Sequence, residues 1–112
     1  MIARSFKARA SIDGAKAYAA FFEKSLVPAL ERIEGHRGAL VLTRAEGSGM
    51  DITVLTFWES MEAVARFAGE TPDRAVVEPE ARAVLGSFDD RVIHEEVAVD
   101  TVRGASRVVK PR

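Results

Sequence analysis

The sequence lacks three residue types that are common in functional sites. It has no cysteine, which excludes disulfides, thiolate metal ligands and a cysteine nucleophile. It also has no asparagine or glutamine, so any chemistry must proceed without side-chain amides, which are common anchors for substrate carbonyls and oxyanions. No apolar run approaches the ~18 residues that a membrane-spanning helix needs.

Charge and targeting signals are equally sparse. The net charge of −1 gives no electrostatic reason to expect a nucleic acid or membrane partner. The opening MIARSFKARAS alternates apolar and basic residues and does not form the apolar core of a signal peptide, so we expect a cytoplasmic protein. No histidine–carboxylate spacing or glycine pattern points to a metal or phosphate site, and we expect neither a metal nor a cofactor.

The 112 residues suit one domain, residues 1–100, followed by a basic tail, residues 101–112. The tail contains four basic residues and no acidic one, whereas acids outnumber bases in the body. We expect it to lie on the acidic body or on a partner chain, with Val108-Val109 as a short edge strand.

The first half of the chain reads as a strand followed by a long helix. Apolar and polar residues alternate from Ile2 to Ala10, which predicts a half-buried strand. Asp13 is the expected helix N-cap, and apolar residues then recur at helical spacing from Tyr18 to Ile33. Pro28 should bend or break this helix near Leu26–Val27.

The second half predicts two paired strands, further helices and a last strand. Residues 39–45 and 50–58 are strand-like and are joined by the turn EGSG. Ser60 is the expected cap of a helix through Ala68. A helical stretch is expected from Thr71 to Val77, interrupted by Pro79, and a strand over residues 91–99.

The order βαββαβ predicts an α+β, ferredoxin-like fold, with a four-stranded antiparallel sheet and helices on one face. Strand 50–58 is apolar on both faces, with Ile52, Val54 and Trp58 on one side and Leu55 and Phe57 on the other. A sheet that is apolar on both sides needs a second cover. In a chain this short we expect a homodimer, with sheet facing sheet.

Four stretches carry a resemblance to a known family: MIARSFKARA, GHRGALVLTR, LTFWES and RAVVEPEARAVLGSFDDRVIHEEV. Together they resemble the antibiotic biosynthesis monooxygenase family over residues 1–99. The resemblance implies the dimeric α/β barrel fold, with ligands bound between the helices and the sheet. It also implies a cofactor-free monooxygenase that oxidises a small aromatic, phenol- or quinol-like substrate with O2.

The family's functional residues match this chain only in part. Haem-degrading members use an Asn, a Trp and a His; here Phe67 stands at the Trp position, and the other two have no counterpart. The resemblance therefore disfavours haem degradation. Oxygenases of aromatic polyketides use Asn, Trp and Tyr, of which this chain has Trp58 and Tyr18.

Two residues are the candidate catalytic groups. His94 lies within the expected last strand, where it is either a pocket base or a histidine bonded at the sheet surface. Arg4 lies among apolar neighbours on a strand and must pair with either a carboxylate or an anionic substrate group. The expected substrate pocket consists of aromatic residues: Phe6, Tyr18, Phe22, Trp58 and Phe67. Trp58 can alternatively serve to pack the corner between strand and helix.

Two functions remain open at this point. One is a cofactor-free monooxygenase, for which a cavity large enough for a two-ring aromatic would argue. The other is a non-catalytic dimeric barrel that binds a small apolar ligand, for which a filled core would argue.

Overall fold

The structure is a computed structural model that describes residues 1–102; the expected edge strand at Val108-Val109 lies outside these residues. Strands and helices alternate along the chain, and a π-helical turn, η1, joins the first two helices. In order the elements are β1 (Ile2–Ser11), α1 (Ile12–Phe21), η1 (Phe22–Leu26), α2 (Val27–Glu31), β2 (His36–Glu46), β3 (Gly49–Trp58), α3 (Met61–Ala68), α4 (Pro79–Val84), β4 (Ser87–Phe88) and β5 (Ile93–Glu96).

The sheet is antiparallel, and its strand order β2-β3-β1-β4 is that of a ferredoxin-like fold. The last expected strand, residues 91–99, is shortened to β5, which pairs with β1, whereas β4, which also pairs with β1, was not expected. This register places Arg4 between two cross-strand neighbours, Thr56 on β3 and His94 on β5. The expected α+β, ferredoxin-like fold is thereby confirmed.

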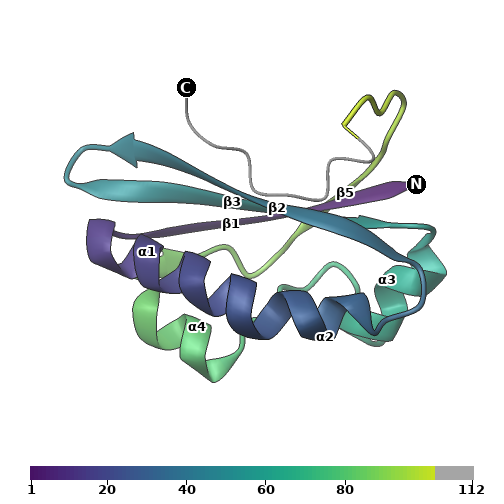
Figure 1. The fold of residues 1–112 in the computed structure, drawn as a ribbon, viewed down its shortest axis with the longest axis horizontal. Coiled ribbons are helices and arrows are strands. Elements are labelled where there is room, and N and C mark those ends of the chain that lie inside the picture. The colour runs from purple at the N-terminus through teal and green to yellow at the C-terminus, as the bar shows by residue number, and fades with distance from the viewer. Residues whose placement is uncertain (103–112) are drawn as a thin grey trace.

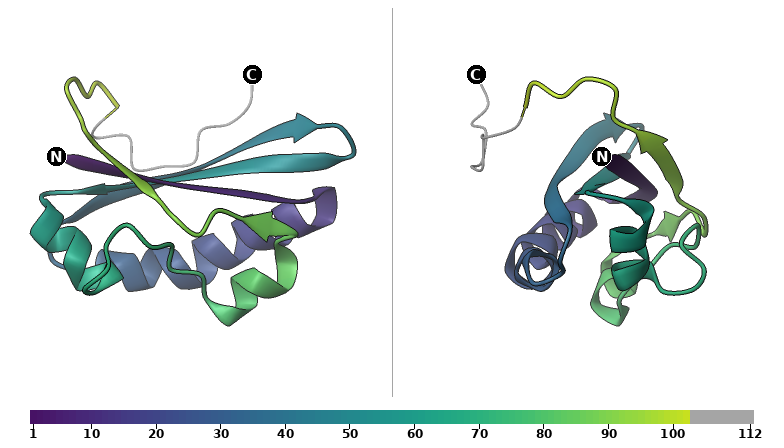
Figure 2. Two further views of the ribbon diagram at one scale, coloured as in Figure 1. Left: turned by 180° about the vertical axis from the view of Figure 1, so that it is seen from behind. Right: turned by 90° about the vertical axis from the view of Figure 1, so that its right-hand side faces the viewer.

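The helices of the described residues lie on one face of the sheet (Figure 1). The end-on view shows α1 and α2 beside α3 and α4 under the curved sheet (Figure 2). Even-numbered residues of β1 and β3 point into the layer between sheet and helices and form the core with residues from the helices. Its fully buried large side chains are Trp58, Leu30, Ile52 and Val64.

The first helix begins earlier than expected. Ser11, not Asp13, is the N-cap, and its hydroxyl accepts a hydrogen bond from the Gly14 amide at 2.9 Å. Both residue types cap helices, and the end of β1 at Ser11 decides between them. Asp13 lies in the first turn, where its charge suits the positive end of the helix dipole.

We expected Pro28 to bend or break the helix, and the helix does not break. The backbone stays helical through η1, where the Val27 amide donates to the Phe22 carbonyl, and continues into α2. Proline has no amide hydrogen and its ring crowds the carbonyl four residues earlier, so one wider turn before it relieves both problems. Phe22 and Leu26 bracket this turn, and both side chains face the sheet.

The prediction of a helix over residues 71–77 was wrong. Residues 69–78 are mostly irregular, and Pro79 opens α4 instead of interrupting a helix. At the other end of α4, Gly14 of α1 comes so close to the Val84 carbonyl that a side chain at position 14 would collide with it. The contact fixes α4 against α1.

The opposite face of the sheet carries apolar side chains toward solvent. Leu42 is 48% exposed and Ile93 is 61% exposed, and Leu40 is 38% exposed. Charged residues border this patch at one end, where Asp51 pairs with Arg9 and with Arg44. Within residues 1–102, no helix is long and apolar enough to cross a membrane.

Candidate functional site

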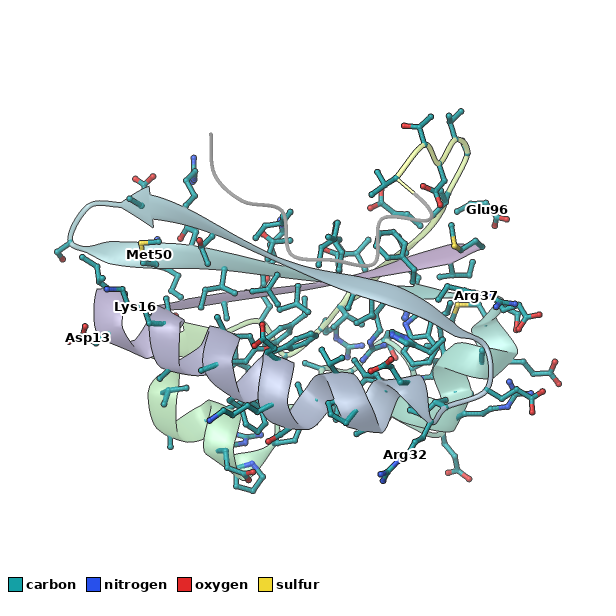
Figure 3. The ribbon with its side chains drawn as sticks, in the orientation of Figure 1. Asp13, Lys16, Arg32, Arg37, Met50 and Glu96 are labelled. Carbon is teal, nitrogen blue, oxygen red and sulfur yellow. The ribbon has the colours of Figure 1, made fainter. Side chains whose placement is uncertain are left out.

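A small cavity lies between the sheet and the helices. Its volume is about 40 Å³, and its wall is mostly apolar. Strands β1 and β3 form the floor, helix α1 with η1 and α2 forms one side, and the segment after α3 forms the other. Its lining residues are Arg4, Phe6, Tyr18, Phe22, Leu26, Leu30, Val54, Thr56, Phe67, Val76, Glu78 and Val92. Figure 3 shows side chains filling this layer, whereas Lys16 and Arg32 point outward.

Arg4 is the buried cation of this cavity, with only 4% of its surface exposed. Nη1 donates to the Pro72 carbonyl and Nη2 to the Arg74 carbonyl, at 2.8 Å. The guanidinium also lies over the Phe67 ring, 5.6 Å from its centroid. No carboxylate forms an ion pair with Arg4 among residues 1–102. Burial lowers the pKa of Arg4 to about 10, opposed by the charge of Asp73, so the side chain is a cation at neutral pH.

His94 is the third hydrogen-bond partner of Arg4. Its Nε2 lies 3.0 Å from Nη1 of Arg4. Because a guanidinium can only donate, Nε2 must accept, which places the ring proton of neutral His94 on Nδ1. Burial lowers the pKa of His94, the charge of Arg4 lowers it further, and Asp73 opposes both. The lone pair that a base would use is therefore engaged by Arg4.

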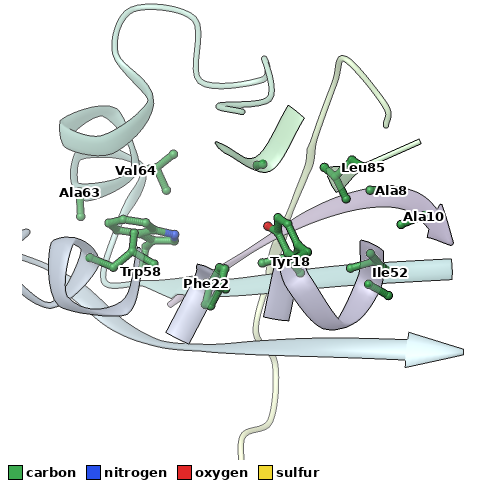
Figure 4. Close-up of a cluster of buried hydrophobic side chains, with 13 residues drawn as sticks. Ala8, Ala10, Tyr18, Phe22, Ile52, Trp58, Ala63, Val64 and Leu85 are labelled. Carbon is green, nitrogen blue, oxygen red and sulfur yellow. The ribbon is translucent and has the colours of Figure 1, made fainter. Parts of the chain in front are cut away.

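Tyr18 brings a second buried polar group to the cavity. The residue is 4% exposed, and within the described part of the chain its hydroxyl makes no hydrogen bond. Figure 4 shows that this hydroxyl points into the interior, toward the side on which Trp58 lies. Burial raises the pKa of Tyr18, and the nearby charge of Glu78 raises it further, so the phenol is neutral. A hydroxyl that lines the cavity without a protein partner is a group that water or a ligand can satisfy.

Glu78 is a site residue that the sequence analysis missed. It lines the cavity from the segment before α4 and is half-buried. Although it occupies the N-cap position of α4, its side chain does not cap the helix. Burial raises the pKa of Glu78, its own backbone amide lowers it, and Glu80 adds a smaller upward effect. The one signal in the sequence is its place in VVEP, an acid between apolar residues and a helix-opening proline.

Trp58 lies behind the cavity rather than in its lining. It is fully buried, and its indole N–H donates to the Thr56 hydroxyl at 2.8 Å. Its ring stacks on Phe67, which does line the cavity, at 5.6 Å between centroids. On its other side His36 packs edge-on at 5.0 Å. His36 begins β2 and is half-buried, and burial lowers its pKa, opposed by the charge of Glu31.

Five of the seven residues proposed from the sequence line the cavity together: Arg4, Phe6, Tyr18, Phe22 and Phe67. The other two do not line the cavity but contact lining residues: His94 contacts Arg4, and Trp58 contacts Phe67. Thr56 also lines the cavity but was not proposed from the sequence; it lies beside Arg4 in the sheet, and its hydroxyl accepts from the Trp58 N–H.

The volume limits what the cavity can hold in this conformation. About 40 Å³ accommodates a few water molecules, since one needs roughly 10–15 Å³ on this measure. An engineered cavity of about 150 Å³ is known to bind benzene, so an aromatic ligand requires the wall to move outward.

The irregular segment 69–78 is the part of the wall that can move most readily. The Ala75 amide donates to the Asp90 carbonyl at 2.8 Å, and the Val92 amide donates to the Asp73 carbonyl at 2.9 Å. The remaining links are the Arg4 hydrogen bonds and an exposed ion pair between Asp73 and Arg91. A single isolated β-bridge, Arg74–Arg91, takes the place of a regular hydrogen-bond ladder here.

Metal ligands do not gather in the described residues: no group of three or more His, Asp or Glu side chains there is arranged to hold an ion.

The comparisons with known proteins concern the fold. No family model matches the sequence, and no curated protein matches it. A solved structure of a candidate antibiotic biosynthesis monooxygenase from Chloroflexus aurantiacus J-10-fl is similar, with a TM-score of 0.49 and 16% sequence identity. The match covers 88% of this chain and 94% of that one. At this TM-score and identity, no residue role follows from the match.

Proposed function

We propose that this protein is a cofactor-independent monooxygenase that oxidises a small phenol- or quinol-like aromatic with O2. The observation that carries the proposal is the pair of buried polar side chains, Arg4 and Tyr18, that line one apolar cavity with unused hydrogen-bonding groups. Three of the five N–H groups of Arg4 are engaged by Pro72, Arg74 and His94. The others are available to an anionic oxygen of a ligand.

The reaction needs little from the protein. A quinol loses a proton, the resulting anion gives an electron to O2, and one oxygen atom is added to the ring. The balance is quinol plus O2 giving hydroxyquinone plus water, so the substrate supplies all the electrons. The protein must orient the ring and stabilise the anion. Here the aromatic side chains Phe6, Phe22 and Phe67 would hold the ring, and Arg4 would face the anionic oxygen.

His94 would act on this reaction through Arg4. By accepting from Nη1, it fixes the plane of the guanidinium without adding a competing negative charge. A carboxylate in its place would neutralise Arg4 and weaken its attraction for a substrate anion. In this proposal His94 is therefore a positioning residue.

A non-catalytic function is the second candidate, because the cavity of about 40 Å³ is far smaller than a two-ring aromatic. On that hypothesis the chain is a barrel module that binds a small apolar ligand in the same place. Both candidates share the binding step, and only consumption of O2 separates them.

The decisive experiment measures O2 uptake with a panel of quinols and hydroxynaphthalenes. The wild type should consume O2 in proportion to substrate, and Arg4→Ala should lose at least ten-fold in kcat/KM. Arg32→Ala, which removes an outward-pointing arginine, is the matched control and should retain full activity. Ligand binding without turnover is followed separately by Trp58 fluorescence, since Phe67 links Trp58 to the cavity. Binding without O2 uptake would establish the second candidate.

We also propose that the protein acts as a homodimer. The open sheet face carries the exposed side chains of Leu40, Leu42 and Ile93 and is bordered by charges of both signs. Such a face is self-complementary across a two-fold axis, because acids of one copy can meet bases of the other. An obligate interface of this kind buries roughly 2,000 Å² or more.

A further inference from the structure

The proposed reaction requires a proton acceptor inside the cavity, and His94 is badly placed to be one. Its accepting nitrogen already receives the Arg4 hydrogen bond, and His94 does not line the cavity. Of the residues that do line it, Arg4 can only donate, and Tyr18 is a neutral phenol. Thr56 already accepts from Trp58. The lining residue that can act as a base is the carboxylate of Glu78.

We propose that Glu78 is the proton acceptor of this site, and that the acidic hydroxyl of the substrate binds between Glu78 and Arg4. This inference rests on the proposed oxygenase function. Glu78 and Arg4 line the same cavity, so a ligand that occupies it can contact both. Glu78 enters from the segment before α4, whereas Arg4 lies on the sheet floor, so they approach the cavity from different walls.

The side chain of Glu78 also serves no evident structural role. It does not cap α4, and no ion pair within residues 1–102 involves it. A half-buried carboxylate beside apolar residues costs free energy unless something compensates it. A half-buried carboxylate that lines a cavity and is stabilised only by its own backbone amide is a candidate functional group.

The step itself balances simply. The proton moves from the substrate hydroxyl to the Glu78 carboxylate, and the electron pair remains on the substrate oxygen as a phenolate beside Arg4. O2 is the oxidant, as in the proposed function. Neutral Glu78 then holds a proton that can be returned when the second oxygen atom leaves as water.

The electrostatic surroundings of Glu78 favour this exchange. Burial raises its pKa, which brings a carboxylate closer to the strength of base needed near neutral pH. Its own backbone amide opposes this shift, and the charge of Glu80 adds to it. The charge of Glu78 in turn raises the pKa of Tyr18 on α1, and Arg4 of β1 lines the same cavity. Because the base is active when ionised, the reaction rate should rise with pH through the raised pKa of Glu78 and then level off.

The test compares Glu78→Gln and Glu78→Asp with Glu23→Gln, which removes an exposed acid from η1, the turn that follows the helix carrying Tyr18. General-base catalysis contributes typically 10²–10⁴-fold. Glu78→Gln should therefore lose about that factor in kcat and lose the acidic limb of the pH profile. Glu78→Asp should keep a displaced acidic limb, and Glu23→Gln should match the wild type. Circular dichroism confirms that each variant is folded.

The outcomes separate the two proposals. If the wild type consumes no O2 with any quinol, the proposed function fails, and the role of Glu78 fails with it. If the wild type is active and folded Glu78→Gln keeps its rate and its pH profile, this inference alone is overturned. If Glu78→Gln lowers activity but leaves the acidic limb in place, Glu78 shapes the cavity without accepting the proton, which also overturns the inference.

Discussion

Trp58 should matter for stability and not for chemistry, and a double-mutant cycle with Thr56 can show it. Trp58→Phe removes part of a fully buried ring together with the indole N–H that donates to Thr56 at 2.8 Å. The lost apolar volume costs about 1–2 kcal/mol, at about 0.8 kcal/mol for each methylene-sized group. The lost hydrogen bond costs about 1 kcal/mol more. The free energy of unfolding should therefore fall by about 2–3 kcal/mol.

Thr56→Val completes the cycle because valine keeps the shape and removes the hydroxyl. The indole N–H of Trp58 is then buried without an acceptor, which costs about 1–3 kcal/mol. In the double variant neither partner of the bond remains, so its loss of stability should be smaller than the sum of the two single losses. The expected difference is about 1 kcal/mol.

The assay is urea unfolding followed by far-ultraviolet circular dichroism, since Trp58→Phe removes the only tryptophan and with it the fluorescence signal. All variants are measured at one protein concentration, because association shifts the midpoint. Additive single losses would show that the hydrogen bond contributes nothing. A Trp58→Phe variant of unchanged stability that has lost all O2 uptake would refute the structural role and assign Trp58 to the reaction.

Three further results are expected. The ring of His94, followed by NMR, should titrate with a pKa below the ordinary histidine value of about 6.5. Because the folded state binds this proton less readily than the unfolded state, the free energy of unfolding should fall as the pH drops below about 6.5. A measured pKa above the ordinary value would contradict the tautomer described here. Sedimentation should give twice the chain mass of 12.2 kDa for the wild type and the single mass for Leu42→Lys; a monomeric wild type excludes the dimer. Arg4→Met should speed amide hydrogen exchange in residues 73–78 relative to Arg32→Met, and equal exchange would show that Arg4 does not hold this segment.

The sheet and much of the helical layer could be predicted because their signals are local. Alternation over Ile2–Ala10 and the β-branched residues before Trp58 each identify a strand without reference to the rest of the chain. Ser60 caps α3 as expected, accepting from the Ala63 amide at 3.2 Å. The helix start at Ser11 could not be settled in the same way, since Asp13 is an equally good cap by residue type.

The segment before α4 escaped prediction because tertiary contacts shape it. Residues 71–77 have the composition of a helix, but the carbonyls of Pro72 and Arg74 are held by Arg4, which is distant in sequence. The aromatic wall of the cavity was foreseen from helical and strand spacing. Glu78 was not, because most glutamates are exposed and only packing shows which one is turned inward.

Because α1 and α4 approach closely at Gly14, a substitution there can alter the candidate site without touching it. A methyl group at position 14 would meet the Val84 carbonyl, and the clash would push the end of α4 away from α1. Since α4 has only six residues, about 9 Å in length, its two ends cannot shift independently. Glu78 stands at the opposite end, so Gly14→Ala should displace an inward-facing carboxylate that it never touches. Position 14 therefore constrains the geometry of the cavity as strictly as a lining residue does.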